Sequence, residues 1–414
     1  MNRGASQWGR RAFAAFLASA LAGCDRSDEK SDQEERSAAN EIASEARDWP
    51  LFRGDAEMQG VSLENLAPPL EIAWTFEPPA EEGRRRAPIT ASPVCGGGRV
   101  FFGGQDAKFY CLDLKTGAPQ WTAEIEGPVS APAALDEKHV YFGDNLGYIH
   151  ALDWKTGAEV WKIEADDKIE GGVNLLDVPS SEGAEEPERR LYIGSHDFNL
   201  YCIRAVSGEV IWKHETENYI MATPSIEASL PAVIFGGCDG FVHFVSARDG
   251  ASVHKIEAGQ YVPNSAAVRD GIAYIAHYGG EVMAVEVASG ETVWKTATGV
   301  EYHASPAVTD KLLIVAGTDK RVAAFDRVTG KEVWAFQASR AFEASPVISG
   351  GLVWVAGQDA RLYALDLATG EEKWSFDLGA QVAASPAISA GTLVICGEDG
   401  RVYGFASGDA GKQP

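Results

Sequence analysis

Basic residues are scarce in this chain of 414 residues. It holds 36 lysines and arginines against 60 aspartates and glutamates, which gives a formal net charge of −24. Nucleic acids and anionic lipid surfaces attract proteins through basic side chains, so this balance disfavours both as partners. The same charge is also what keeps an exported domain soluble.

Motifs of the common catalytic and metal sites are missing as well. The eight histidines follow no His-x-x-x-His or mixed His/Cys ligand spacing, and no two of the six cysteines are adjacent. Gly96-Gly97-Gly98 reads as a hairpin turn rather than a phosphate loop, because no helical pattern follows it. We therefore assign no catalytic residue and no metal ligand from motifs.

The chain has no apolar run of the roughly 20 residues that a membrane-spanning helix needs. Residues 1–23 hold three arginines, no acid and a short apolar run from Ala12 to Ala22, which is the pattern of a signal peptide. The ending Leu21-Ala22-Gly23-Cys24 resembles the lipobox of bacterial lipoproteins and implies a lipid on Cys24. Arg10-Arg11-Ala12-Phe13 resembles a twin-arginine export motif, so the export route stays open.

Residues 24–48 are rich in Glu, Asp, Ser, Arg and Ala and hold almost no large apolar residue. Such a segment cannot bury enough surface to become ordered, which predicts a disordered tether. Random-coil scaling gives it a mean span of roughly 25–30 Å. Asp25 resembles the inner-membrane retention signal of enteric bacteria, a rule that other bacteria need not follow, so both membranes stay open.

One pattern recurs along most of the remaining chain with a period of about 40 residues. In the copy from Leu352 to Trp374, two short β-branched and aromatic runs flank the turn Gly357-Gln358-Asp359, and Thr369-Gly370 leads into a strand with Trp374. Such runs and turns predict four short strands per copy, and the period is typical of a β-propeller. In one copy, His254 stands where the others have tryptophan.

Both ends of the repeat array are incomplete in complementary ways. A strand around Trp74 precedes the first full copy, and the last copy, Ser385 to Gly408, lacks its Trp strand. The fold prediction is all-β: a single, monomeric eight-bladed β-propeller of four-stranded antiparallel blades at 71–408, closed by the strand around Trp74 and followed by a tail at 409–414. We expect a tryptophan to dock neighbouring blades at seven of the eight seams: Trp74, Trp121, Trp161, Trp212, Trp294, Trp334 and Trp374.

The remaining cysteines fit this pattern as small apolar residues. Cys111 and Cys202 replace the alanine that other copies carry before leucine or its equivalent, so we expect both to be buried and unpaired. Cys95 and Cys396 fall in blades that neighbour each other across the closure. Whether they form a disulfide is left open by the sequence.

The copies resemble the pyrroloquinoline-quinone (PQQ) type of repeat through Ala304-Ser305-Pro306, Tyr363-Ala364-Leu365-Asp366 and the Trp endings. Trp49-Pro50-Leu51-Phe52-Arg53-Gly54 is similar to a motif that often precedes such propellers, and we expect the segment 49–70 to pack on the rim. Two branches share these repeats. Quinoprotein dehydrogenases bind PQQ and calcium on the propeller axis, and many carry adjacent cysteines over the cofactor; BamB-like envelope lipoproteins are non-catalytic scaffolds for outer-membrane barrel assembly.

Candidate binding residues gather in the turns between second and third strands and at the start of the inner strands. Repeat arrays vary most where they bind, and aromatic side chains often anchor interfaces. That turns merely tolerate such variation stays an open alternative. The candidates are Glu170, His196, Met221, Tyr261, Asn264, Tyr302, His303, Phe342 and Glu343.

A lipobox, a tether and one bare propeller resemble the BamB-like branch. This resemblance implies a cofactor-free scaffold on the periplasmic side of a bacterial membrane, which binds envelope proteins through one propeller face. The alternative is a PQQ-dependent dehydrogenase or a small-ligand sensor, in which Glu170, Asn264 and Glu343 converge on the axis and hold calcium. His303 and Glu343 would then be an acid and base pair.

Overall fold

The computed structural model describes residues 48–79, 85–179 and 187–408, which belong to one compact unit. Cys24, the signal peptide, the tether up to 47 and the tail at 409–414 lie outside the described residues. Among the residues that are described, no helix has the length and apolar character needed to cross a membrane.

Thirty-two strands in the described ranges form eight four-stranded antiparallel sheets, the blades, numbered here from the innermost strand outward. Blade 1 contains β2 (Val94–Gly96), β3 (Arg99–Gly103), β4 (Lys108–Asp113) and β5 (Pro119–Glu124). Blade 2 contains β6 (Ala134–Leu135), β7 (His139–Gly143), β8 (Tyr148–Asp153) and β9 (Glu159–Glu164). Blade 3 contains β10 (Asn174–Val178), β11 (Glu188–Gly194), β12 (Asn199–Arg204) and β13 (Val210–Glu215). Blade 4 contains β14 (Ser225–Glu227), β15 (Ala232–Gly236), β16 (Phe241–Ser246) and β17 (Ser252–Glu257).

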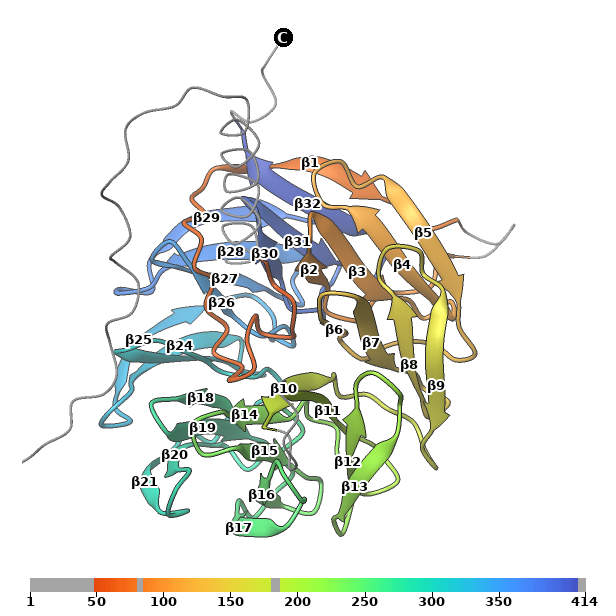
Figure 1. Cartoon of the computed structure of the whole chain (residues 1–414). Helices are drawn as coiled ribbons and strands as arrows, with labels where there is room; N and C mark the ends of the chain where they lie inside the picture. Colours follow the sequence, from red (N-terminus) through yellow and green to blue (C-terminus); the bar gives the residue numbers. More distant parts are fainter. Residues whose placement is uncertain (1–47, 80–84, 180–186, 409–414) are drawn as a thin grey trace, which may run out of the picture. The chain divides into compact units, whose positions relative to one another are not determined.

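The other four blades follow the same plan (Figure 1). Blade 5 contains β18 (Ala267–Arg269), β19 (Ile272–His277), β20 (Glu281–Glu286) and β21 (Thr292–Ala297). Blade 6 contains β22 (Ala307–Val308), β23 (Leu312–Ala316), β24 (Arg321–Asp326) and β25 (Glu332–Gln337). Blade 7 contains β26 (Val347–Ser349), β27 (Leu352–Ala356), β28 (Arg361–Asp366) and β29 (Glu372–Asp377). Blade 8 contains β30 (Ala387–Ser389), β31 (Thr392–Cys396), β32 (Val402–Ser407) and β1 (Leu70–Phe76).

The ring closes as the sequence predicted. Strand β1, from the start of the propeller, pairs antiparallel with β32, and Trp74 lies opposite Gly404. A Cβ at Gly404 would lie 2.1 Å from Cε2 of Trp74, so the indole needs a glycine there. The predicted eight-bladed propeller of four-stranded blades, closed by the strand around Trp74, is therefore confirmed.

In seven of the eight blades, a small residue on the third strand makes room for the tryptophan of the fourth. Ala364 pairs with Trp374, and Cys111 and Cys202 take the same place opposite Trp121 and Trp212. Both thiols are buried and free, and burial raises the pKa of Cys202 to about 12. These cysteines act as small apolar residues, as their alignment with alanine indicated.

Tryptophans join each blade to the next except at the seam of blades 4 and 5, where His254 lies on Gly290. Trp334 of blade 6 lies on Gly370 of blade 7, where a Cβ would come 2.4 Å from Cε3, and its Nε1 donates to the carbonyl of Leu367 at 3.0 Å. Five more tryptophans lie on the turn glycine of the following blade in the same way: Trp74, Trp121, Trp161, Trp212 and Trp294. Trp374 instead packs edge-on against Phe405 of β32 at 6.4 Å, because the closing blade ends in the chain's own N-terminal strand.

An arc of serine hydroxyls links the inner strands of blades 5, 6, 7, 8 and 1. The backbone N–H of Ser265 donates to Oγ of Ser305 at 3.1 Å, and Ser305 donates to Ser345 at 3.0 Å. Ser345 continues to Ser385 at 3.0 Å, and Ser385 donates to Ser92 across the closure at 2.9 Å. The serine of each Ala-Ser-Pro motif thus satisfies a buried backbone donor of the preceding blade.

Residues 48–66, which we call the cap segment, lie across the inner strands rather than on the rim, where we had placed them. Trp49 is 2% exposed, and Arg53 is 1% exposed with its Nη2 donating to the carbonyl of Pro306 at 3.1 Å. Burial lowers the pKa of Arg53 to about 9. Backbone N–H groups of six inner strands donate to carbonyls of residues 49–60; the donors are Cys95, Leu135, Ile226, Val268, Val308 and Ile348. The cap segment therefore covers one end of the propeller axis.

Candidate functional site: a funnel on the propeller axis

The end of the axis opposite the cap segment opens into a cavity of about 150 Å³. Its mouth is formed by one side chain from the start of each inner strand, and the five serines of the arc also line the cavity. Phe52 of the cap segment also lines the cavity. The eight mouth residues are Thr90, Ser130, Glu170, Met221, Pro263, His303, Glu343 and Ala383. Four predicted site residues, Glu170, Met221, His303 and Glu343, therefore share this mouth ring.

Glu170 is held by two basic groups. Nζ of Lys168 lies 2.7 Å from Oε1, and Nε2 of His196 lies 2.9 Å from Oε2. The hydrogen bond from His196, assisted by Lys168, lowers the pKa of Glu170 to about 2. The ring of His196 also stacks on Tyr219, with centroids 4.6 Å apart. A carboxylate with so low a pKa stays charged at neutral pH and is a weak proton acceptor.

His303 and Glu343 form a second pair on the far side of the mouth. Nδ1 of His303 lies 2.7 Å from Oε2 of Glu343, and this hydrogen bond raises the pKa of His303. The imidazole also packs on Tyr278, with ring centroids 4.7 Å apart. Each carboxylate of the mouth ring therefore has a basic partner within the protein.

Asn264 lines the cavity but is only 4% exposed. Its Nδ2 donates to three backbone carbonyls, of Ala276 at 2.6 Å, Tyr302 at 3.1 Å and Ala304 at 3.2 Å. These bonds fix the amide at the seam of blades 5 and 6. The side chain of Asn264 therefore links backbone carbonyls of two neighbouring blades.

Tyr302 and Phe342 are not on the binding face, where we had expected them. Tyr302 is 3% exposed and Phe342 is fully buried, each packed among core side chains between two blades. They precede the mouth residues His303 and Glu343 directly. In other blades the same place holds a buried aliphatic residue such as Ile169. Alternation along an extended strand therefore turns these two rings inward.

Exposed apolar side chains lie on blades 2 to 5, in the turns and strand entries of the propeller face on which the cavity opens. Tyr261, one of the predicted residues, is 50% exposed, and Tyr219, at the equivalent position of the preceding blade, is 42% exposed. The sequence reasoning missed two further members, Leu146 at 56% and Phe198 at 37%. Phe198 has φ of 74°, and the equivalent turn residues Ala107, Lys320 and Ala360 share this left-handed conformation, which therefore belongs to the repeat. We call Leu146, Phe198, Tyr219 and Tyr261 the aromatic patch.

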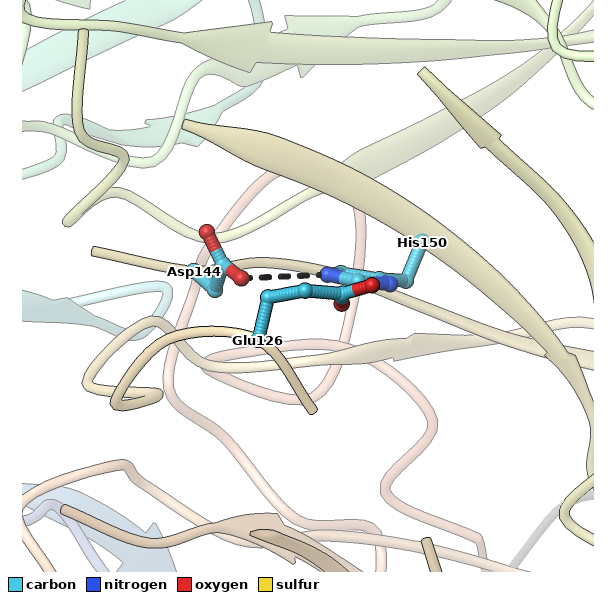
Figure 2. A group of neighbouring side chains, drawn as sticks. All are labelled: Glu126, Asp144 and His150. Carbon is cyan, nitrogen blue, oxygen red and sulfur yellow. Dashed lines mark hydrogen bonds and ion pairs between the residues drawn. The ribbon is translucent and has the colours of Figure 1, made fainter. Parts of the chain in front are cut away.

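A further cluster brings together Glu126, Asp144 and His150 (Figure 2). Asp144 and His150 are fully buried, and Oδ2 of Asp144 lies 3.3 Å from Nε2 of His150. Oδ1 of Asp144 also accepts the backbone N–H groups of Leu146 and Tyr148, each at 2.9 Å. The cluster holds the β7–β8 turn together and leaves little of the carboxylate for a metal ion.

Other blades hold the same turn with an Asp–Tyr pair, such as Tyr363 and Asp359 at 2.6 Å or Tyr403 and Asp399 at 2.7 Å. In blade 2 the ring is His150, and the carboxylate comes from Asp144, two residues earlier than in those blades. Glu126 forms an ion pair with Lys162. We therefore interpret the three residues as a structural variant of the repeat.

The family model described as outer membrane protein assembly factor BamB matches the chain in four overlapping stretches, 71–163, 147–255, 238–345 and 318–413. The chain belongs to this family. Its members share the PQQ-type repeat that the sequence indicated. Among curated proteins, no sequence matches the chain.

Solved structures show the same fold in proteins of both branches. BamB from Moraxella catarrhalis is 18% identical, with a TM-score of 0.66 over 84% of this chain and 100% of its own. A europium-containing methanol dehydrogenase is 13% identical, with a TM-score of 0.75 over 89% of this chain and 100% of its own. Quinohemoprotein alcohol dehydrogenase from Comamonas testosteroni is 15% identical, with a TM-score of 0.73 over 91% of this chain and 83% of its own. At these identities the similarity establishes the propeller fold.

The axial cavity, which we call the funnel, fits PQQ and calcium poorly. Calcium takes six to eight oxygen ligands, yet Glu170 and Glu343 are each paired with a basic side chain, which leaves Oδ1 of Asn264 as the one buried oxygen without a partner among the three candidate ligands. No tryptophan among the described residues lines the cavity, so a stacking platform for the quinone is missing there. We derive no reaction through these groups.

Proposed function

We propose that this family member is a non-catalytic envelope scaffold. It binds partner proteins through the propeller face on which the axial cavity opens, which we call the funnel face. The observation that carries the proposal is the aromatic patch, whose four members are 37% to 56% exposed on the face where the axial cavity opens. Clustered apolar residues of this kind mark interaction surfaces, and tyrosine is among the side chains enriched at binding hot spots. The family match supports the same conclusion.

The state of Glu170 supports binding over catalysis at this carboxylate. A general base works best with a pKa near the working pH, whereas the pKa of Glu170 is about 2. Its neighbours His196 and Lys168 are committed to the same carboxylate. Such fixed, paired charges give a surface orientation and specificity for a partner.

We further propose that a lipid on Cys24 anchors the scaffold on the periplasmic side of a bacterial membrane. The apolar run before Cys24 and the acidic, serine-rich tether after it support this assignment. The propeller would then be held within roughly 25–30 Å of the bilayer surface on average. Which membrane carries it is left to experiment.

A PQQ-dependent dehydrogenase or small-ligand sensor is the second candidate. It is favoured by one observation, the convergence of Glu170, Asn264 and Glu343 on the axial cavity. Calorimetric titration of PQQ with calcium present separates the two functions. We expect no tight binding; submicromolar affinity that Glu170→Ala abolishes would favour the second candidate.

Affinity purification of the full, membrane-extracted chain tests the scaffold. Tyr219→Ala with Tyr261→Ala should lose the co-purifying envelope proteins. The matched control is Val293→Ala with Val333→Ala, which alters side chains of similar exposure on the outer strands β21 and β25. Loss of the same partners from both variants, or from neither, would argue against the funnel face.

A further inference from the structure

One pair of side chains in blade 4 differs in chemistry from its counterparts in blades 1 to 3. In those three blades, a polar residue of the turn between the second and third strands hydrogen-bonds to the mouth residue of the same blade. The three pairs are Gln105 Nε2 with Thr90 Oγ1 at 3.0 Å, Asn145 Oδ1 with Ser130 Oγ at 2.8 Å, and His196 Nε2 with Glu170 Oε2 at 2.9 Å. In blade 4 the same two places hold Cys238 and Met221, and Sγ lies 3.6 Å from Sδ.

This sulfur pair lies at the edge of the funnel and not in the core. Met221 lines the funnel and is half-buried. Cys238 is 8% exposed, whereas the other four cysteines among the described residues are 0% exposed. The backbone of Cys238 is fixed, because its N–H donates to the carbonyl of Tyr219 at 2.9 Å and its carbonyl accepts from Nδ2 of Asn218 at 3.1 Å. The thiol is therefore held in place where solutes can approach it.

A thiol beside a thioether is a ligand set for a soft metal ion. Cys and Met sulfur atoms select Cu(I), whereas calcium and magnesium take oxygen ligands. With metal–sulfur bonds of about 2.3 Å and a tetrahedral angle, two sulfur atoms on one ion lie about 3.7 Å apart. The separation of 3.6 Å between Sγ of Cys238 and Sδ of Met221 is close to that spacing. Both atoms can therefore bind one ion without a movement of the backbone.

The charge around Cys238 favours an ion with a single positive charge. Burial, together with the negative charges of Asp239 and Glu170, raises the pKa of the Cys238 thiol, so the thiol is protonated at neutral pH. When the sulfur binds a metal ion, its proton passes to the solvent. Because Cu(I) carries one charge, this exchange leaves the net charge of the site unchanged, which limits the cost of placing an ion in a mostly buried position.

We propose that Cys238 and Met221 form a binding site for Cu(I) at the mouth of the funnel. The thiolate and the thioether supply two ligands, and the solution in the funnel offers any further donor. This role separates Cys238 from Cys202, which fills an alanine position opposite Trp212 in a strand. The site does not depend on the binding of partner proteins at the funnel face.

The probe is Cu(I), supplied as its bicinchoninate complex with ascorbate and without oxygen. The protein is the full chain with Cys24→Ser, which removes the thiol of the one cysteine that lies outside the described residues. We expect the chain to withdraw one equivalent of copper from the coloured complex. X-ray absorption at the copper edge should then show sulfur neighbours at about 2.3 Å. Failure to withdraw copper would overturn the proposal.

Two variants and a control test the location. Cys238→Ser and Met221→Leu each remove one sulfur atom with little change in size. Each should weaken Cu(I) binding by about 100-fold or more, since loss of even an outer-shell partner costs about 10–100-fold. Cys111→Ala, which introduces the residue that Ala364 provides in blade 7, should leave binding unchanged.

Met221→Leu keeps the test valid if Cys238→Ser does not fold. It also separates a metal site from a reactive thiol alone, because it leaves Cys238 in place. Wild-type affinity in either variant, or an equal loss in Cys111→Ala, would overturn the assignment of the ion to this pair.

Discussion

His254 lies on Gly290 as the tryptophans lie on theirs, although it is not a tryptophan. A Cβ at Gly290 would come 2.8 Å from Cγ of the imidazole, and Nε2 lies 3.0 Å from the carbonyl oxygen of Ala288. The hydrogen bond of the docking motif is thus kept, and the loss is in apolar area. An indole buries about 150–250 Å², and an imidazole buries less.

The first prediction concerns this difference in area. Trp334 is 9% exposed, so Trp334→Ala should lower the free energy of unfolding by about 3–5 kcal/mol through lost burial and a cavity. His254→Ala should cost clearly less. Val333→Ala, next to Trp334 and 52% exposed, is the control and should change little. Chemical denaturation measures all three, and equal losses for Trp334 and His254 would contradict the area argument.

The second prediction concerns His303. Its pKa is raised by the hydrogen bond to Glu343, so the pair contributes stability that is present below the ordinary histidine pKa of 6.5 and lost as the pH rises through the folded-state value. Glu343→Gln should return the pKa of His303 toward 6.5 in an NMR titration. It should also reduce stability more at about pH 6 than at about pH 8. An unchanged His303 titration in the variant would show that Glu343 does not set it.

The third prediction concerns Glu170, whose pKa falls from 4.5 to about 2. Because the folded-state pKa is lowered, the stability it contributes is present above pH 4.5 and lost as the pH falls toward 2. Glu170→Gln should therefore destabilise the protein at pH 7, and the difference from the wild type should shrink across that acidic window. A difference independent of pH would indicate a purely steric role.

Regular spacing is what made the fold predictable. Each regular seam needs a glycine under a tryptophan, as at Gly370 under Trp334, and such pairs repeat at a period that counting recovers. The same register placed Glu170 and Glu343 in one ring of side chains. The repeat register did not identify Phe342 as a core residue, because an aromatic side chain suits both a core and an interface. Comparison with Ile169, buried at the same place, would have decided it.

The cap segment could not be placed in this way. Residues 48–66 belong to no repeat, so no register relates them to the blades. Their contacts depend on backbone donors at the ends of inner strands, such as Val268 donating to Glu57 and Val308 donating to Gln59. Backbone donors leave little trace in the side-chain sequence. The burial of Arg53 marks the position of the cap segment only once the surrounding structure is known.

The fourth prediction concerns the anchor. Cys24→Ser should release the protein into the soluble periplasmic fraction, since no run of roughly 20 apolar residues elsewhere could hold it in a membrane. Fractionation with immunoblotting, and mass spectrometry of the mature N-terminus, provide the measurement. A variant that stays firmly in the membrane fraction would contradict lipidation at Cys24.

The central claim is that the funnel face binds envelope proteins, and site-specific photo-crosslinking in cells tests it most directly. A photoreactive phenylalanine analogue replaces Tyr261, which is 50% exposed in the aromatic patch, or Val333, which is 52% exposed on the outer strand β25. The proposed function predicts discrete higher-mass adducts with envelope proteins from position 261 and none of these from position 333. Adducts from position 333 alone, or the same adducts from both positions, would contradict a binding site at the funnel.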